Sequence, residues 1–187
     1  MSSAPACRTR ISIEDYLDGE TRSDIKHEYL DGEVVAMGGA SATHGLVAGA
    51  FHAALLPHAR RKGCQLFMAD MKVRIEHSGQ TYFYYPDLLL ACDPQDRDPY
   101  YRRCPCLIVE VLSPSTERID HREKLFAYQA APSLREYLLV DPEKRSVEVY
   151  RFGDPVRYET FTEGSIRLDC LNAEITLDEI YMDAEAL

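Results

Sequence analysis

The sequence lacks long apolar segments. No run approaches the roughly 18 apolar residues that a membrane-spanning helix requires, and residues 1–10 lack the apolar block of a secretory signal. Both absences predict a cytoplasmic protein with no membrane partner. The sequence contains no internal repeat and no low-complexity segment. With 187 residues, 45% apolar and 28% charged, the chain is expected to form one domain over residues 1–187, with a core at about 13–161 and an acidic extension at 162–187.

A cysteine pattern that indicates disulfides or a zinc site is also missing. Only Cys104 and Cys106 lie close together, and no second Cys or His pair follows at zinc-finger spacing. A chain of this length does not need disulfides to hold its core. We therefore favour reduced thiols packed as small apolar side chains over a structural metal. The six cysteines are Cys7, Cys64, Cys92, Cys104, Cys106 and Cys170.

The chain has little positive charge to spare, since its net charge is −10. Taken alone, this value argues against a nucleic-acid partner. Nine acidic residues and two arginines lie in 154–187, however, so that segment carries −7 and residues 1–153 carry only −3. Each local basic cluster is typical of a solvated surface, and net charge leaves a nucleic-acid partner open. The clusters are Arg60–Lys62, Arg102–Arg103 and Arg118 with Arg122 and Lys124.

The order of apolar and turn-forming residues predicts a mixed β-sheet flanked by helices. Ser12 is placed to cap a short first helix, and Asp31-Gly32 is typical of the tight turn of a hairpin over His27–Met37. Apolar residues at helical spacing predict a helix from about His44 to Arg61, ended by Gly63. Further strands are expected at 65–67, 71–76, 81–85, 87–91, 107–112, 136–140, 147–150, 157–161 and 166–168, with helices at 118–130 and from Thr176.

Glu110 is the most informative residue of the chain. Every neighbour in Leu107–Leu112 is apolar, which is typical of a strand buried on both faces at the centre of a sheet. Strand alternation places Glu110 on one face with Ile108 and Leu112. An unpaired ionised carboxylate there costs several kcal/mol, so a partner must compensate it. That partner is either a buried Arg or Lys or a divalent cation.

Asp87 favours the cation. It follows Pro86 at the beginning of the apolar segment Leu88–Leu90, and proline is tolerated best at the first residue of a strand. Two acids on adjacent strands supply the oxygen ligands that Mg²⁺ prefers.

The next helix offers an amine. Asp120, Lys124 and Tyr128 are spaced i, i+4 and i+8 and therefore lie on one helix face. The alternative is a surface Asp–Lys pair worth a few tenths of a kcal/mol. The short link 113–117 turns the helix back onto the strand of Glu110, so Lys124 is expected to reach the carboxylates.

These motifs together resemble the Uma2 family of the PD-(D/E)XK nuclease superfamily. The resemblance runs from about Ile13 to Phe161, and its most specific part is the block Glu110–Thr116 with the downstream Lys124 and Tyr128. The other matching segments are Tyr29-Leu30-Asp31-Gly32-Glu33, Thr43-His44, Pro86-Asp87-Leu88, Arg135-Glu136-Tyr137 and Val140-Asp141-Pro142.

The resemblance implies a restriction-endonuclease-like α/β (α+β) fold, here with an added β-meander and a short C-terminal helix. It implies that Asp87, Glu110 and the carbonyl of Val111 bind Mg²⁺ or Mn²⁺. One position departs from the superfamily pattern, which has a lysine two residues after the acid, where this chain has Leu112. Lys124 from the following helix is expected to replace it, with Lys72 a less favoured substitute.

The leading hypothesis is a Mg²⁺- or Mn²⁺-dependent endonuclease that hydrolyses DNA. Lys124 would position the attacking water or the phosphate, Tyr128 would support the site, and a homodimer would extend the small DNA contact. Glu28, His44 and Asp120 are possible additional site residues. Two alternatives stay open: a catalytically inactive nuclease fold that binds nucleic acid or protein, and a purely structural Glu110–Lys124 ion pair.

Overall fold

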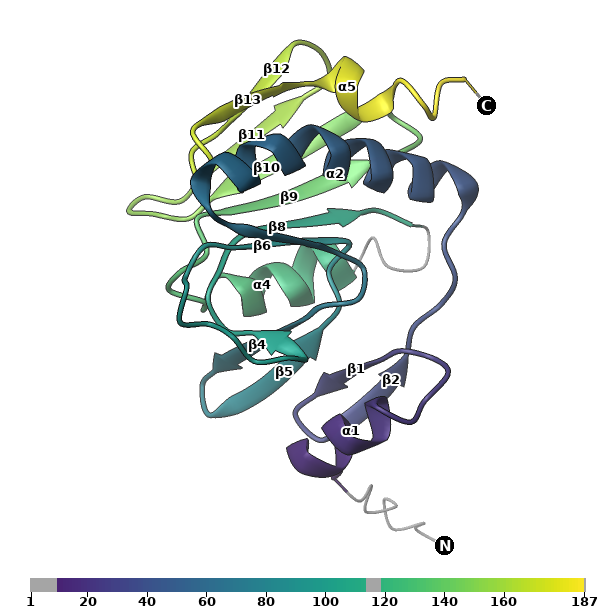
Figure 1. The fold of residues 1–187 in the computed structure, drawn as a ribbon, viewed down its shortest axis with the longest axis vertical. Coiled ribbons are helices and arrows are strands. Elements are labelled where there is room, and N and C mark those ends of the chain that lie inside the picture. Colours follow the sequence, from purple (N-terminus) through teal and green to yellow (C-terminus); the bar gives the residue numbers. More distant parts are fainter. Residues whose placement is uncertain (1–9, 114–118, 187) are drawn as a thin grey trace, which may run out of the picture.

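The computed structural model describes residues 10–113 and 119–186. Within this part of the chain, a five-stranded sheet, a six-stranded sheet and a two-stranded hairpin are arranged in layers with helices (Figure 1). Helix α2 runs along one face of the six-stranded sheet, while α4 lies on the other face, between that sheet and strands β4 and β5 (Figure 1).

The five-stranded sheet begins with the predicted hairpin. Asp31 and Gly32 both have positive φ, 49° and 99°, the backbone of a type I′ turn, which confirms the expectation from the Asp-Gly pair. Ser12 caps the first helix by accepting the N–H of Asp15. The sheet has the order β2-β1-β5-β4-β7. The elements are α1 (Ile13–Glu20), β1 (His27–Leu30), β2 (Glu33–Ala36), β4 (Lys72–His77), β5 (Gln80–Tyr84) and β7 (Tyr101–Arg102).

The six-stranded sheet has the order β11-β10-β9-β8-β6-β3. It is mixed, because β8 pairs parallel with β9 and antiparallel with β6. The long helix covering it ends at Gly63, whose φ of 71° suits a residue without Cβ. The elements are α2 (Ala42–Lys62), β3 (Gln65–Met68), β6 (Leu88–Ala91), β8 (Pro105–Val111), β9 (Glu136–Asp141), β10 (Ser146–Arg151) and β11 (Arg157–Phe161).

Strand β8 lies between two hydrophobic cores, one on each of its faces. Leu107, Val109 and Val111 pack on the side of α2. Ile108 and Leu112 pack on the opposite side, against β4, β5 and α4 (Leu125–Tyr128). Glu110 shares the alternation of this second face, as its sequence position predicted.

The helix expected at 118–130 is shorter and irregular in its described part. A π-helical turn, η1 (Asp120–Lys124), precedes α4. The wider turn is a feature often found at functional sites. Ser115, Thr116 and Arg118, on which parts of the sequence interpretation rest, lie outside the described residues.

The C-terminal segment forms the hairpin β12 (Ser165–Leu168)–β13 (Ala173–Thr176) and helix α5 (Leu177–Tyr181). The predicted capping box is present, with Thr176 and Glu179 each accepting the other's backbone N–H. This segment packs on α2 and buries Ile175, Leu177 and Ile180 in the first core. No helix within 10–113 or 119–186 has both the length and the apolarity needed to cross a membrane.

The expectation of reduced cysteines was wrong for four of them. Disulfides join Cys64 to Cys92 and Cys106 to Cys170, while Cys104 has no disulfide partner within residues 10–113 and 119–186. The partners are 28 and 64 residues apart in the chain, so their proximity depends on strand pairing and not on any local spacing.

Candidate active site

A cavity of about 290 Å³ contains nearly all of the predicted site residues. It lies between the β2–α2 connection, one end of the interior strands β6 and β8, and η1. Tyr128 is the one predicted site residue absent from its lining. The predicted residues that line it are Glu28, His44, Asp87, Glu110, Val111, Asp120 and Lys124.

Asp87 and Glu110 meet because strands β6 and β8 pair antiparallel. Leu88 faces Val109 in the register, so the preceding Asp87 lies at the level of Glu110. The backbone N–H of Val111 donates to Oδ2 of Asp87 at 2.7 Å. His44, from the first turn of α2, brings Nε2 to 3.3 Å from the same oxygen. The two acids therefore lie on adjacent strands at one end of the sheet and line the same cavity.

Lys124 lies at the centre of three carboxylates. Its Nζ is 3.1 Å from Oε1 of Glu110, 3.1 Å from Oε1 of Glu28 and 3.2 Å from Oδ1 of Asp120. Glu28 comes from β1, Glu110 from β8 and the other two from η1, so three separated segments meet here. The Lys124 side chain is only 5% exposed. The sequence correctly predicted that this lysine reaches the strand of Glu110.

The described residues of the cavity carry excess negative charge. Four of them are acidic, and Lys124 is the only lysine or arginine among them. Oε1 of Glu28 and Oδ1 of Asp120 are buried and accept no hydrogen bond within the described part of the chain, although both lie near Nζ of Lys124. Lys124 forms ion pairs with Glu110, Glu28 and Asp120, so one positive charge is shared by three carboxylates and offsets their charge only in part.

The pKa values of Glu110 and Lys124 are both raised in this cavity. Burial raises the pKa of Glu110 well above its ordinary value; Lys124 opposes the shift, and Asp120, Asp87 and Glu28 add to it. Burial by itself lowers the pKa of Lys124, but the three surrounding carboxylates outweigh it and hold that pKa well above the usual range. The surrounding carboxylates therefore favour the protonated, positively charged form of Lys124.

The pKa of His44 is raised by its neighbour Asp87. The hydrogen bond to Asp87 raises the pKa of His44, burial opposes the rise, and the negative charge of Asp87 and a hydrogen bond with the backbone of Val111 reinforce it. His44 thus links the two strands that carry the acids. The sequence placed this histidine at the beginning of a helix and made it a possible additional site residue, and in the structure it lines the cavity.

Tyr128 lies behind the cavity and supports Glu110. Its hydroxyl donates to Oε1 of Glu110 at 2.9 Å, and the side chain is fully buried. Burial raises the pKa of Tyr128 well above its ordinary value, as does the charge of Glu110, so the hydroxyl stays protonated and remains a donor. Behind it, Tyr137 donates to the carbonyl of Asp120 at 3.1 Å.

The sequence matches the Uma2 family, described as "Putative restriction endonuclease", over residues 13–179. The chain belongs to the Uma2 family.

Two relatives come from Synechocystis sp. "Uncharacterized protein slr1290" is 38% identical over 78% of this chain and 76% of its own length. "Uncharacterized protein sll1609" is 32% identical over 75% of this chain and 80% of its own length. A crystal structure described as "a putative nuclease belonging to DUF820", from Anabaena variabilis, superimposes with a TM-score of 0.75 at 14% identity, covering 93% of this chain and 99% of that one. The expected mixed α+β nuclease fold is thereby confirmed.

Sequence reasoning missed Tyr85 as a residue of this Uma2-family cavity. Tyr85 lines it, and its hydroxyl donates to Oε2 of Glu20 at 2.7 Å and accepts from Nζ of Lys72 at 2.9 Å. Its place immediately before Pro86-Asp87 was the available signal. Lys72, the less favoured substitute for Lys124, is buried but is not among the cavity's lining residues.

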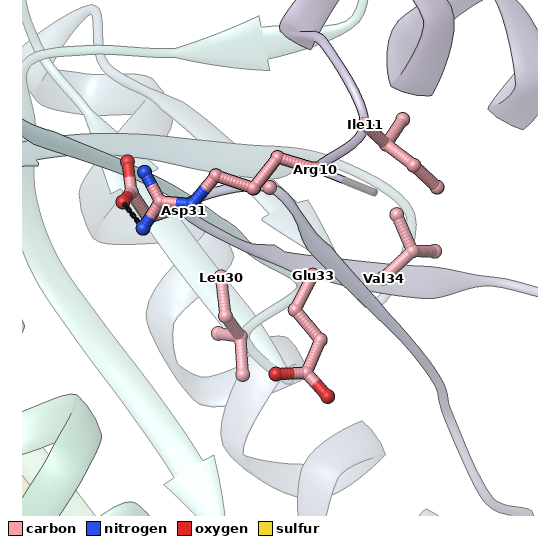
Figure 2. A pocket seen from close by; sticks show the side chains of 7 residues that line it. Arg10, Ile11, Leu30, Asp31, Glu33 and Val34 are labelled. Atoms are coloured by element: carbon pink, nitrogen blue, oxygen red, sulfur yellow. Dashed lines mark ion pairs between the residues drawn. The ribbon is translucent and has the colours of Figure 1, made fainter. Parts of the chain in front are cut away.

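A separate pocket of about 480 Å³ lies at the N-terminal hairpin. Figure 2 shows Arg10 reaching across it to Asp31, with Nη2 to Oδ2 at 2.9 Å. Its other labelled side chains are Ile11, Leu30, Glu33 and Val34. None of the predicted site residues is among the described residues that line this pocket.

Proposed function

We propose that this chain is a Mg²⁺- or Mn²⁺-dependent endonuclease that hydrolyses phosphodiester bonds of DNA. The observation that carries the proposal is the cluster of Asp87, Glu110, Glu28 and Asp120 in one cavity with a single compensating lysine among its described residues. The family description and the nuclease fold support the same class of reaction.

The residues of the cavity fit a hard divalent cation. Oxygen ligands are what Mg²⁺ and Mn²⁺ prefer, and the cavity supplies four carboxylates, three of which share the single positive charge of Lys124. Asp87 and Glu110 would hold the ion, with the carbonyl of Val111 as a third ligand. Such an ion, when bound, lowers the pKa of a coordinated water and offsets charge developing on a phosphate.

The chain's own residues have distinct roles in this proposal. Lys124 keeps its proton and presents a fixed positive charge beside the acids, where it orients a water or a phosphate oxygen. Tyr128 holds the Glu110 carboxylate by its hydrogen bond. The Val111 N–H and His44 hold Asp87, so that both acids are fixed before substrate arrives.

The surroundings of the cavity suit a polymeric substrate. A second hollow of about 520 Å³ shares Met37–Ala40, His44, Tyr85 and Asp87 with the acidic cavity. The site therefore continues into a longer groove, as a strand that extends on both sides of the scissile bond requires. The groove still offers a small contact area, and we propose that a homodimer extends it.

Mn²⁺ titration by calorimetry tests the metal site. The wild type should bind Mn²⁺, and Asp87→Asn and Glu110→Gln should lose binding, because each removes a charged ligand. Glu143→Gln is the matched control, since Glu143 is an exposed acid outside the cavity. Equal Mn²⁺ binding by Glu110→Gln and wild type would refute the site.

Cleavage of single-stranded, duplex and branched DNA then tests the activity. Asp87→Asn, Glu110→Gln or addition of EDTA should abolish cleavage, and Lys124→Met should slow it by about 100- to 1,000-fold, the usual effect of removing one charge-stabilising group. If Lys124→Met cleaves as fast as wild type, the role of that lysine is wrong. If wild type binds both Mn²⁺ and DNA but cleaves none of the substrates, the chain is a binding module, the alternative to which Leu112 at the usual lysine position points.

A further inference from the structure

Four cysteines from separate parts of the chain converge at one place. The Sγ atoms of Cys92, Cys106 and Cys170 all lie within 4.8 Å of one another, and Cys64 is bonded to Cys92. Two independent disulfides would only require that each pair approach. Here the pairs also approach each other, because Sγ of Cys92 lies within 4.8 Å of both sulfurs of the other pair, and the fourth sulfur, that of Cys64, reaches the group through its bond to Cys92.

Strand pairing fixes three of these side chains. Gln65 faces Ala91 in the β3–β6 register, so Cys64 and Cys92 lie opposite each other one step beyond, with Cα atoms 4.2 Å apart. The β6–β8 register shifts between Leu90 and Ala91, where their partners are Leu107 and Pro105. Cys106 is the extra residue of that bulge, and bulges re-aim side chains.

The fourth side chain is fixed from the other side. Cys170 follows β12, and its backbone N–H donates to Oε2 of Glu136 at 2.9 Å, while the N–H of Asp169 donates to Oε1 at 3.0 Å. Cys170 is buried in the first core, and the other three cysteines pack against that core. The cluster therefore joins α2, the central strands and the C-terminal hairpin.

We propose that Cys64, Cys92, Cys106 and Cys170, in their reduced state, bind one Zn²⁺ through four thiolates. Zinc–sulfur bonds of about 2.3 Å in a tetrahedron separate the sulfurs by about 3.8 Å, which falls within the 4.8 Å spread of Cys92, Cys106 and Cys170. Thiolates select soft metals, whereas the carboxylates of the acidic cavity select hard ones. This site is independent of the proposed nuclease function.

A nearby cation suits the charge of such a centre. Four thiolates around Zn²⁺ carry a net charge of −2, and Nζ of Lys62 donates to the carbonyl of Cys170 at 2.5 Å. The ammonium group is thus held beside the cluster, where it offsets this charge.

The disulfides and the zinc centre are two states of the same four sulfurs. A phosphine and one water reduce each disulfide, giving two thiols and a phosphine oxide. Zn²⁺ then displaces four protons from the four thiols. Because the metal would join three layers of the fold, its binding is expected to stabilise the folded chain.

Titration of phosphine-reduced, metal-free protein with Co²⁺ tests the proposal. We expect one Co²⁺ per chain at this cluster, with sulfur-to-cobalt charge-transfer absorption, displaced by one equivalent of Zn²⁺. Native mass spectrometry should show the corresponding single zinc ion. Absence of the charge-transfer absorption in the reduced wild type would overturn the proposal.

Variants separate this centre from the acidic cavity. Substituting a residue that only supports a metal ligand weakens metal binding by about 10- to 100-fold. Cys106→Ser removes a ligand itself and should therefore weaken Zn²⁺ binding by more than about 100-fold. Cys64→Ser, at the half-buried margin of the cluster, repeats the test if Cys106→Ser does not fold. Cys104→Ser is the matched control, and Asp87→Asn should also keep the sulfur-to-cobalt absorption. Equal zinc binding by Cys64→Ser, Cys106→Ser and Cys104→Ser would refute the assignment.

Discussion

The substitution Lys124→Met tests how much the amine of Lys124 contributes to the free energy of unfolding through its ion pairs in the acidic cavity. Methionine keeps much of the side-chain volume but removes the positive charge that lies 3.1–3.2 Å from Glu110, Glu28 and Asp120. The buried carboxylates of Glu110 and Asp120 and the partly buried carboxylate of Glu28 then lie close together without their common partner. The resulting change in stability separates a buried charge network from an ordinary surface ion pair.

The expected loss is large. Breaking a buried ion pair by removing one partner costs about 3–5 kcal/mol, because the other charge stays buried. For a chain of this size each kcal/mol lowers Tm by about 2–4 °C, so the variant should melt roughly 6–20 °C below wild type. Part of the cost is relieved if Glu110 takes up a proton, which its raised pKa favours.

Urea unfolding in EDTA is the appropriate assay, with Lys144→Met as the matched control. Lys144 also pairs with an aspartate, Asp141 at 2.9 Å, but its side chain is 72% exposed, so its loss should cost less than about 1 kcal/mol. A cost below 1 kcal/mol for Lys124→Met as well would refute the reasoning about the cavity.

The same variant reports on the metal. Mn²⁺ at 100 times Kd should stabilise a folded chain by about 2.7 kcal/mol. The effect should be at least as large in Lys124→Met, because the ion replaces the missing positive charge beside the acids. If Mn²⁺ stabilises neither protein, the cavity is a structural ion-pair network and not a metal site.

Further predictions concern the supports of the site and the fold. Tyr128→Phe removes the hydrogen bond to Glu110 and should cost about 1.5–3 kcal/mol in urea unfolding; an unchanged midpoint would contradict that role. Thr176→Ala removes the cap of α5 and should cost about 1 kcal/mol, whereas Thr176→Ser should restore most of it. For Asp141, burial raises the pKa, but hydrogen bonds from Lys144 and from the backbone of Lys144 and Glu143 outweigh it and leave the pKa lowered. Its contribution should therefore be complete at neutral pH and disappear as pH falls below about 4, so Asp141→Asn should be less stable than wild type at pH 7 and equal to it near pH 2.

Local patterns were sufficient for most elements. The Asp31-Gly32 turn, the Gly63 helix end and the Thr176 capping box follow from backbone preferences of a few neighbouring residues, and all were found where expected. Glu110 was identifiable for a related reason: an acid within an apolar strand needs a partner wherever that strand lies.

Side-chain partners across the fold were beyond local reasoning. Tyr85 lines the cavity, and its hydroxyl forms hydrogen bonds with Glu20, 65 residues away in the sequence, and with Lys72, 13 residues away. The disulfide of Cys64 with Cys92 depends on a strand register, and that of Cys106 with Cys170 on a bulge together with a distant hairpin.

The sequence by itself determined the turns, the caps, the buried strands and the need of Glu110 for a partner, because these depend on residues adjacent in the chain. Only the tertiary structure decided that Asp87 and Glu110 line one cavity, that Lys124 forms ion pairs with three acids, and that four cysteines form two neighbouring disulfides. Those contacts arise from registers between segments far apart in sequence, and a register is set by the packing of whole faces rather than by any one residue.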